Sequence, residues 1–285
     1  MSGSVIDGIT YLSHTKHHPL QHLRLSQLLA MLLIFPCVGS SQATANLQKP
    51  FSLGLKTMVQ AVGIANQNNY GQNEMDYSFR AGFGAGLVAS LQVAPKGELQ
   101  MEVLYQNWGQ DYSDSFKGRH FEKQIRYALL SIPLLYKVQF TEPPSGYAGV
   151  GSELKPHWYI LGGIQADRIM SPEIQWRLDG GTTEFLPFVL EGGNPNQDVL
   201  EAMGEPSSDA DLFTQWDAML IAAGGFELYT NAQLSFTVEL RGGIGLTDMN
   251  AEVYRLDNNR GVYAASRNAF LGLHLGGAWR FTKPD

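Results

Sequence analysis

Cysteine and charge are both scarce in this sequence. Cys37 is the only cysteine in 285 residues, which excludes an internal disulfide framework. Charged residues make up 16% of the chain, below the roughly one quarter that is usual for a globular domain. The formal net charge of −7 argues against nucleic acid as a partner, because binding to phosphates needs basic surfaces.

Long hydrophobic runs are also missing. Beyond residue 45, no segment reaches about 18 consecutive apolar residues, the length that marks a transmembrane helix. We therefore expect no membrane-spanning helix. A role inside a membrane would require a closed β-barrel, because only a barrel pairs all the backbone groups of its strands.

The N-terminus carries the pattern of an export signal. An apolar core runs from Leu28 to Val38, and the small residues Ala43-Thr44-Ala45 follow it. The side chains before this core include Lys16, His17, His18 and Arg24. We expect residues 1–45 to be a signal peptide that is cleaved near 41–45, and residues 46–285 to form the mature domain. An uncleaved anchor is the alternative.

Strict alternation dominates the rest of the chain. In residues 77–93, YSFRAGFGAGLVASLQV, apolar side chains occupy the odd positions, and small or polar ones occupy the even positions. This period of two predicts a β-strand, and it lasts far longer than the roughly five or six residues of an average strand. Gly82, Gly84 and Gly86 share the even face, which suits the crowded interior of a small closed barrel. We expect the odd face to meet lipid.

Eight such segments predict the fold. They are residues 51–66, 77–93, 98–112, 127–140, 157–169, 216–230, 232–246 and 268–281. Short connections are expected at 94–97 and 230–233, and long ones at 66–76, 113–120, 171–212 and 249–265. This asymmetry is typical of outer-membrane barrels, although the connection 141–156 is long where a short turn is expected. We predict an all-β fold, an eight-stranded antiparallel up-and-down transmembrane β-barrel with long external loops.

The direction in which the apolar face points does not follow from alternation alone. A soluble lipocalin-like binder would turn that face inward, and a membrane barrel turns it outward. Aromatic residues near the strand ends favour the membrane barrel, because they form girdles at its two interfaces. This predicted aromatic girdle consists of Tyr77, Phe79, Tyr105, Trp158, Trp216, Trp279 and Phe281.

The opposite face carries charges of both signs, which we call the lumen charge cluster. Its predicted members are Lys56, Arg80, Glu102, Lys137, Asp217, Glu227, Glu239 and Arg241. Inside a lumen these charges can pair with one another, and side chains just fill a barrel of eight strands. We expect a plugged barrel without a stable open channel. A narrow pore for small solutes is the alternative. Pro133 predicts a local irregularity in its strand.

The sequence resembles the PorT-like outer-membrane β-barrel proteins, which are grouped with the small OmpA/OmpX-type barrels. The segments FSLGLKTM, YALLSIPLLYK, WDAMLIAAGGFEL, VELRGGIGLTDM and LGLHLGGAWRF carry this resemblance over about residues 51–281. It implies a place in the outer membrane of gram-negative bacteria. It also implies a link to secretion across that membrane, and no catalytic motif.

Catalytic and metal-binding patterns are weak. His120, His157 and His274 are the histidines of the mature chain, and they share no metal-ligand spacing. We expect no catalytic, cofactor or metal site. The alternative is a lipid-modifying hydrolase at the outer rim, because one predicted loop holds a combination that could form a Ser/His pair. These residues are Ser113, Asp114, Ser115 and His120.

The longest predicted loop, residues 171–212, is strongly acidic. Besides Glu173, its acidic side chains are Asp179, Glu184, Glu191, Asp198, Glu201, Glu205, Asp209 and Asp211. A loop of this length is usually either functional or disordered. It could bind a basic partner or a divalent cation that also bridges lipopolysaccharide, or it could be a solvated loop.

The sequence thus favours an exported, monomeric outer-membrane barrel that contacts lipid and does not bind nucleic acid. A structural or interaction role is expected, with membership of an envelope or secretion complex as the more specific hypothesis. The alternatives are the narrow pore, the lipid hydrolase and the soluble binder.

Overall fold

The computed structural model describes residues 51–65, 76–116, 119–141, 155–183, 209–230, 233–252, 255 and 263–281. All of them belong to Gln48–Asp285, the second of two units into which the chain divides. The predicted signal peptide and most of the 141–156 connection lie outside the described residues. Both therefore stay predictions.

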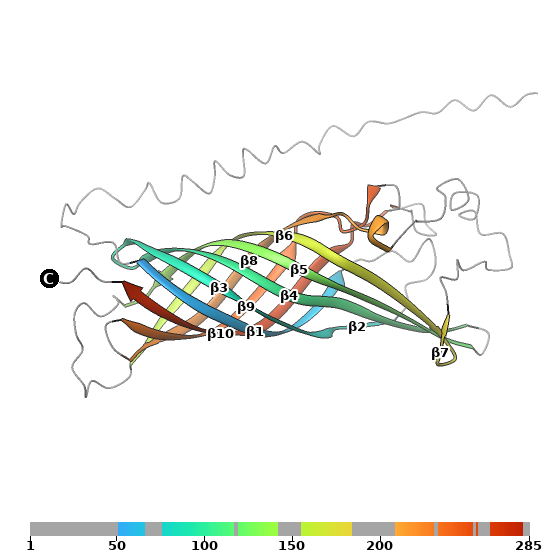
Figure 1. Cartoon of the computed structure of the whole chain (residues 1–285), viewed down its shortest axis with the longest axis horizontal. Helices are drawn as coiled ribbons and strands as arrows, with labels where there is room; N and C mark the ends of the chain where they lie inside the picture. The colour runs from blue at the N-terminus through green and yellow to red at the C-terminus, as the bar shows by residue number, and fades with distance from the viewer. Residues whose placement is uncertain are drawn as a thin grey trace, which may run out of the picture. The chain divides into compact units, whose positions relative to one another are not determined.

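Eight long strands form a closed barrel (Figure 1). They are β1 (Phe51–Ala65), β3 (Arg80–Ala94), β4 (Gly97–Phe116), β5 (Arg119–Gln139), β6 (Pro156–Leu178), β8 (Trp216–Tyr229), β9 (Leu234–Gly245) and β10 (Arg267–Phe281). Each pairs antiparallel with the neighbouring long strand in the chain, and β1 pairs with β10 to close the wall. The predicted eight-stranded up-and-down barrel is confirmed.

Two short strands extend the sheet at its margins. β2 (Asp76–Ser78) pairs with β4, and β7 (Gly181–Thr183) pairs with β6. One 3-10 helix, η2 (Asp209–Leu212), precedes β8. No helix among the described residues is long and apolar enough to cross a membrane.

The two ends of the barrel differ. β1 begins and β10 ends at one end, where a tight turn also joins β3 to β4. The β1–β3, β6–β8 and β9–β10 connections lie at the other end, where β4, β5 and β6 extend furthest (Figure 1). The β5–β6 connection is also long, but it lies at the first end, because β5 ends and β6 begins there. Outer-membrane barrels place their short turns in the periplasm and their long loops outside. We therefore call the end with the β3–β4 turn the periplasmic end, and the opposite end the extracellular end.

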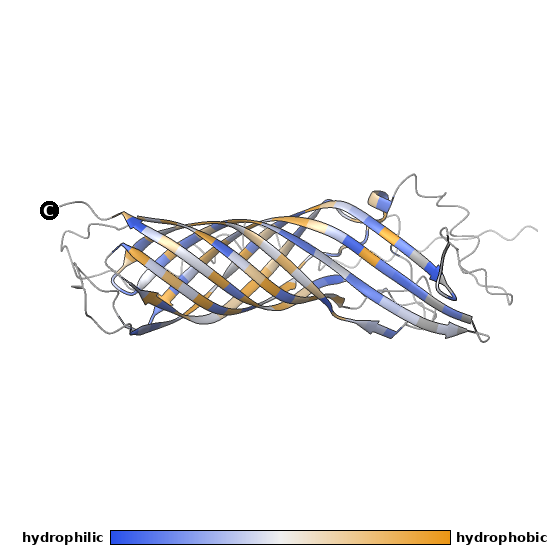
Figure 2. Cartoon of the chain, turned by 60° about the horizontal axis from the view of Figure 1, so that its bottom comes forward, coloured by the Kyte–Doolittle hydropathy of each residue, from blue (hydrophilic) through white to orange (hydrophobic). Residues whose placement is uncertain are grey.

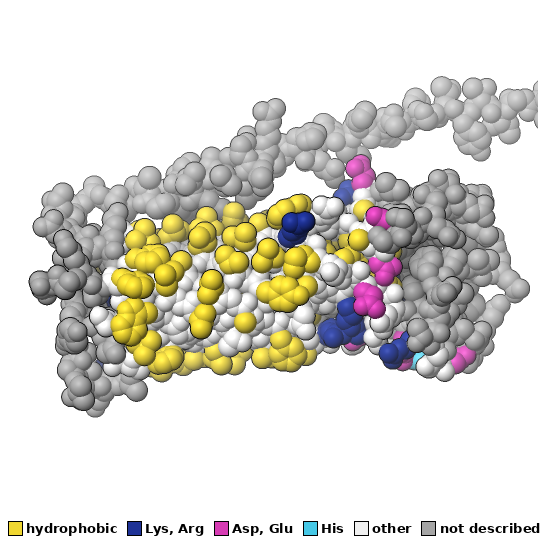
Figure 3. Space-filling view, viewed as in Figure 1, with side chains coloured by type: hydrophobic (Ala, Val, Ile, Leu, Met, Phe, Trp, Pro, Cys, Tyr) yellow, Lys and Arg dark blue, Asp and Glu magenta, His cyan; other side chains and the backbone are white. Residues whose placement is uncertain are grey.

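The outer surface of the barrel is a belt of large apolar side chains. Leu55 on β1, Leu87 on β3 and Leu271 on β10 are 66%, 61% and 58% exposed. Figure 3 shows such hydrophobic side chains along the barrel, and Figure 2 shows the alternation along each strand that produces them. The predicted lipid-facing parity is confirmed, and an apolar face that points inward, as in a lipocalin, does not fit.

The inner surface is too crowded for side chains at several positions on β3. A Cβ atom on Gly84 would lie 2.9 Å from the Cγ of Gln106 and from the carbonyl oxygen of Tyr105. A Cβ on Gly86 would overlap the backbone of Val103 and Leu104. Strands and side chains therefore pack so closely inside the barrel that these even-numbered positions of β3 require glycine.

Three neighbouring strands continue beyond the belt. β4, β5 and β6 have 20, 21 and 23 residues, against 12 to 15 in the other wall strands. On β4 the outward side chains change from Tyr105 to the polar Asn107 and Asp111, so this part lies outside the apolar belt. We call residues 107–116, 119–127 and 169–178, together with β2 and β7, the extracellular sheet.

Two predicted loops are corrected by the extracellular sheet. Residues 113–116 and 119–120 lie on β4 and β5, and residues 171–178 lie on β6. The ladder simply continues, with Ser115 opposite His120 and Arg177 opposite Glu122. The outward face is polar there because no lipid covers it, and the strands therefore lack the apolar alternation that identifies a strand in the sequence.

β5 contains two irregularities. No pairs with β4 form opposite Pro133 and Ile132, and the ladder resumes in the same register on both sides, as expected for a residue without an N–H. On the β6 side the register shifts between Arg126 and Ala128, close to Ser171, which has a φ of 47°. This bulge marks the start of the extracellular sheet.

Candidate functional site

Four charged residues in the middle of the lumen form one ion-pair group, which we call the central lattice. Arg241 Nη1 lies 2.7 Å from Glu102 Oε2, and Arg241 Nε lies 2.5 Å from Glu239 Oε1. Lys56 Nζ lies 2.6 Å from Glu102 Oε1 and 3.6 Å from Glu239 Oε2. Since β1, β4 and β9 supply these residues, the group spans the lumen from wall to wall.

The central lattice is fully buried and electrically balanced. The four side chains are 0–3% exposed, and the two positive charges match the two negative ones. Gln100 and Tyr159 donate further hydrogen bonds to Glu102 and Glu239. Buried charges are tolerated only when paired and hydrogen-bonded in this way, so each member depends on the others.

His274 lies in the same part of the lumen and is 1% exposed. Neither of its ring nitrogens has a hydrogen-bond partner among the described residues. Its ring centroid lies 6.3 Å from that of Phe270, at the boundary between the central lattice and the apolar side chains above it.

A second ionic group lies nearer the periplasmic end. Lys137 Nζ lies 2.9 Å from Glu98 Oε2 and 2.8 Å from Glu227 Oε2, and it sits 4.9 Å from the ring centroid of Tyr159. Gln139 donates a further hydrogen bond to Glu227. Glu98 was not among the predicted members of the lumen charge cluster, although it has the same parity on β4 as Glu102.

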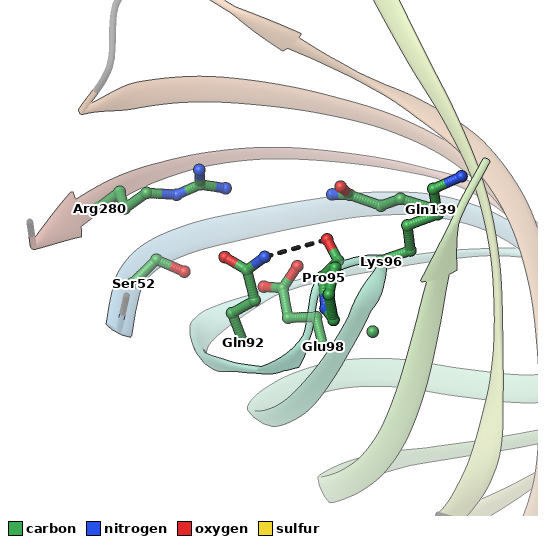
Figure 4. Close-up of a pocket in the computed structure, with 8 residues that line it drawn as sticks. Ser52, Gln92, Pro95, Lys96, Glu98, Gln139 and Arg280 are labelled. Atoms are coloured by element: carbon green, nitrogen blue, oxygen red, sulfur yellow. Dashed lines mark hydrogen bonds between the residues drawn. The ribbon is translucent and has the colours of Figure 1, made fainter. Parts of the chain in front are cut away.

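One small pocket lies at the periplasmic mouth (Figure 4). Its volume is about 10 Å³, and it is lined by Ser52, Gln92, Pro95, Lys96, Gly97, Glu98, Gln139 and Arg280. Gln92 donates a hydrogen bond to the carbonyl oxygen of Pro95 at 3.1 Å. A space of this size holds about one water molecule, so the pocket is not a site for a larger ligand.

Above the central lattice the lumen changes character. Gln60 donates to Gln106 at 2.8 Å, and Gln106 donates to Ser131 at 2.7 Å. Beyond this polar layer, a cluster of buried apolar side chains extends to the extracellular end, together with the buried polar side chains of Gln110, Lys123, Asp167 and Asn268. The apolar side chains include Val62, Ile64, Trp108, Ile125, Tyr127, Leu129, Ile169, Met219, Ile221 and Phe270. We call this set the apolar layer.

Two loop segments cover the apolar layer. Leu212, Phe213 and Met249 are 5%, 6% and 0% exposed and belong to the same apolar cluster. Phe213 pairs with Asn250 in an isolated β-bridge, and the N–H of Ala251 donates to the carbonyl oxygen of Leu212 at 3.1 Å. We call residues 209–215 and 248–251 the extracellular cap, because they close the lumen at this end.

Asp248 holds the second segment of the cap in place. Its carboxylate accepts hydrogen bonds from the backbone N–H groups of Asn250 and Ser266, each at 3.1 Å, and from the hydroxyl of Tyr263 at 2.5 Å. Burial and this carboxylate raise the pKa of Tyr263 to about 12. Arg255 Nε lies 3.0 Å from the same carboxylate.

Two predicted members of the lumen charge cluster lie elsewhere. Arg80 is only partly buried and forms no ion pair with the central lattice within the described residues. Asp217 lies at the extracellular end, where it accepts hydrogen bonds from Thr247 and from Asn268, the latter at 2.7 Å. Its register partner on β6 is Asp167, a buried carboxylate outside the predicted lumen charge cluster.

The residues of the predicted aromatic girdle are all exposed, and most of them lie at the two ends of the belt. Trp158, Trp279 and Phe281 lie at the periplasmic end, where Phe281 stacks on Phe51 with ring centroids 6.0 Å apart. Tyr105 and Trp216 lie at the extracellular end of the belt, in one row across β4, β5, β6 and β8. Tyr77 lies beyond the belt on β2, opposite Tyr112, and Phe79 directly follows β2. The positions of the other five aromatic residues match the two interfaces of a bilayer.

Four acidic residues of the predicted loop are described, and the first of them, Glu173, lies on β6. Asp179 accepts a hydrogen bond from the N–H of His120 at 2.9 Å, and Asp209 accepts one from the N–H of Ile174 at 2.8 Å. Both carboxylates therefore satisfy backbone groups of the extracellular sheet. Asp211 is exposed on η2. The other members, Glu184, Glu191, Asp198, Glu201 and Glu205, lie outside the described residues.

The candidate Ser/His pair lies at the tip of the β4–β5 hairpin. Ser115 Oγ lies 3.3 Å from His120 Nδ1, and His120 Nε2 lies 3.4 Å from Glu122 Oε1. Ser115 is ten residues beyond Tyr105, which places it about 25 Å above the belt for a strand tilted by about 40°. The pair is therefore too far from the bilayer to reach the ester bonds of a membrane lipid.

Within the described parts of the chain, no group of three or more His, Cys, Asp or Glu side chains could hold a metal ion. Lys123 on the inner side of the extracellular sheet lies 5.5 Å from the ring centroid of Tyr112, and burial lowers its pKa to about 8.

Comparison with known families agrees with this architecture. The model of a family described as outer membrane protein beta-barrel domain matches residues 40–251. The chain belongs to this family. The protein is therefore an outer-membrane β-barrel protein, and its apolar belt faces lipid. A comparison with curated protein sequences found no match.

Several solved barrels are distantly similar to the chain. Neisserial surface protein A has 11% identity and a TM-score of 0.38, with 81% of this chain and 97% of that one covered. OprG of Pseudomonas aeruginosa has 11% identity and a TM-score of 0.36, with 82% and 97% covered. Ail of Yersinia pestis, in complex with a heparin analogue, has 9% identity and a TM-score of 0.32, with 82% and 99% covered.

Proposed function

We propose that this outer-membrane barrel has an interaction role, in which the closed barrel anchors the extracellular sheet in the membrane. One observation carries this proposal: β4, β5 and β6 continue as paired strands beyond the belt, while ion pairs, apolar side chains and a cap fill the lumen behind them. A solute pathway would need an open lumen. A docking surface needs a firmly held sheet outside the bilayer.

The partner that we propose is another protein of the envelope, such as a component of a secretion complex. The outward face of the extracellular sheet offers both signs of charge, for example Asp111, Glu122, Arg126, Glu173 and Arg177. Such a mixed surface suits a protein partner, because complementary charges fix the register of an interface. The resemblance to PorT-like proteins and the acidic residues of 184–208 support the same proposal.

Photo-cross-linking in living cells tests this role. A photo-reactive amino acid is introduced at Gln124, which faces outward on the extracellular sheet, and in a matched variant at Leu134, which faces lipid on the same strand. Purification from the outer membrane and mass spectrometry then identify the cross-linked products. We expect a discrete envelope protein from Gln124 and none from Leu134.

Two results would contradict the proposal. The same proteins cross-linked from Leu134 and from Gln124 would indicate random collisions in the membrane. A lack of protein products from Gln124, from Glu173 and from Arg177 would mean that the outward face of the sheet has no protein partner.

A further inference from the structure

An exposed arginine lies at the extracellular margin of the lipid-facing belt. Arg168 points outward from β6, and its guanidinium carbon lies 5.9 Å from the ring centroid of Trp216 on β8. Its register partner on the other side is Leu130, which in turn pairs with Tyr105. The arginine therefore lies in the same row as two aromatic residues of the extracellular girdle, at the level of lipid headgroups.

Arg168 has no carboxylate within ion-pair distance in the described part of the chain. Arg126, which lies further out on β5, differs in this respect, because its Nη2 lies 2.5 Å from Asp111 Oδ1. An arginine stacked on a tryptophan keeps its donors free for a planar anion such as phosphate. The contrast indicates that the partner of Arg168 is not part of the sheet.

A second exposed arginine lies at the same margin. Arg267 is the first residue of β10, points outward and pairs with Ala65. β6 and β10 are separated by β8 and β9, so the two arginines are three inter-strand steps apart, or about 15 Å at the usual strand spacing.

On the periplasmic side of these arginines, one row of the belt carries only small residues, and we call it the shallow row. Gly162, Ala222 and Gly242 face lipid in one row across β6, β8 and β9. A Cβ atom on Gly162 would meet only the carbonyl oxygen of Ile221, at 3.5 Å, and one on Gly242 would meet nothing closer than 3.5 Å. In contrast to Gly84 inside the barrel, the packing of the barrel does not require glycine at these two positions.

We propose that Arg168, Trp216 and Arg267 bind the phosphates of a phosphorylated glycolipid in the outer leaflet, with an acyl chain over the shallow row. Charge complementarity argues for this occupant, because Arg168 and Arg267 are exposed at the level of the headgroup layer and neither forms an ion pair with another described residue. Guanidinium groups bind phosphate through paired hydrogen bonds. This inference rests on the orientation that the proposed function uses, with the extracellular sheet outside.

Lipid retention tests the proposal. The full-length mature protein and its variants are reconstituted in phosphatidylcholine vesicles that contain bisphosphorylated lipid A, dephosphorylated lipid A or phosphatidylglycerol. The protein is then extracted gently, and native mass spectrometry measures the lipid that remains bound. Arg168→Ala and Arg267→Ala are compared with Arg177→Ala, which removes the same charge from the same strand as Arg168, close to the hairpin tip and far above the bilayer.

We expect the wild-type protein to retain bisphosphorylated lipid A, and Arg168→Ala to retain roughly three- to tenfold less, as expected for charged contacts at an exposed site. Arg267→Ala should also lower the amount of retained lipid A, and Arg177→Ala should retain as much as the wild type. Higher salt should lower wild-type retention, because the contacts are solvent-exposed.

Three outcomes would overturn the proposal: equal retention by wild type and Arg168→Ala, equal retention of dephosphorylated lipid A, or equal retention of phosphatidylglycerol. The shift in gel mobility on heating shows separately whether each protein is folded in the vesicles. A wild-type protein that does not insert would contradict the membrane orientation itself. Inserted protein with equal retention would contradict only the lipid site.

Discussion

The two halves of the lumen are filled by different means. Near the periplasm and in the middle, ion pairs such as Arg241–Glu102 and Lys137–Glu227 join side chains from different strands. Toward the outside, Trp108, Ile125 and Phe270 pack as in the core of a soluble domain, and Phe213 of the cap covers them. Among the described residues, strands supply the side chains of the lower half, whereas loop segments complete the upper half.

This difference indicates what each half contributes. Buried ion pairs recover the cost of removing charges from water only when their geometry is complete, so they add little net stability and specify one register. Apolar packing stabilises in proportion to the area that it buries and tolerates small shifts. We therefore expect the lower half to fail abruptly when one charge is lost, and the upper half to weaken gradually.

Removing one charge from the central lattice should have the largest effect. Glu102→Leu leaves Lys56 and Arg241 with one remaining carboxylate, on Glu239, and should lower the free energy of unfolding by about 3–5 kcal/mol. Urea titration in lipid vesicles measures this change. The double variant Glu102→Leu/Arg241→Leu keeps one charge of each sign and should recover much of the loss. If the double variant lost as much free energy of unfolding as the two single variants lose together, this expectation would be contradicted.

Truncating the cap should have the next largest effect. Phe213→Ala opens a cavity above the apolar layer and should cost about 3 kcal/mol in the same titration, because a buried phenylalanine side chain is lost. Phe140→Ala, an exposed residue at the periplasmic end, is the control and should cost less than half as much. Equal costs would show that the cap does not pack on the lumen.

Crowding inside β3 should have a smaller effect. Gly84→Val forces side-chain atoms toward Gln106 and Met58, and we expect a loss of about 1–3 kcal/mol or a lower folding yield. Ala85→Leu adds more atoms on the lipid-facing side of the same strand, and its effect should stay within about 0.5 kcal/mol. If both substitutions were tolerated equally, the assignment of the two faces would be reversed.

An exposed ion pair of the extracellular sheet should have the smallest effect. Arg126 and Asp111 have side chains that are 23% and 36% exposed, so solvent screens their attraction. Arg126→Ala should cost less than about 1 kcal/mol, and the cost should shrink further in high salt. A loss as large as that of Glu102→Leu would show that burial is not what separates the two kinds of pair.

Much of the barrel could be predicted from the sequence, because a period of two assigns each side chain to one face. Alternation placed Leu87 and Leu271 outside, and Lys56 and Arg241 inside. It could not show which inward charges meet, since residues such as Lys56 and Glu239 come together only when the sheet closes. Arg80 and Asp217 have the parity of the central lattice but lie too near the extracellular end to join it.

The extracellular sheet could not be predicted in the same way. Around Asp111 and Gln124, the outward face is polar because water replaces lipid there, and the contrast between faces is lost. The cap was hidden for another reason. Phe213 and Met249 lie in connections between strands, and nothing in their spacing indicates that they fold back over the lumen.

The conductance of the folded wild-type protein in a planar bilayer tests the closed lumen most directly. The central lattice and the extracellular cap close the lumen at two separate levels, so the account predicts no long-lived current steps at neutral pH. Persistent steps of uniform size that scale with salt concentration would mean that the lumen conducts, and would contradict the account.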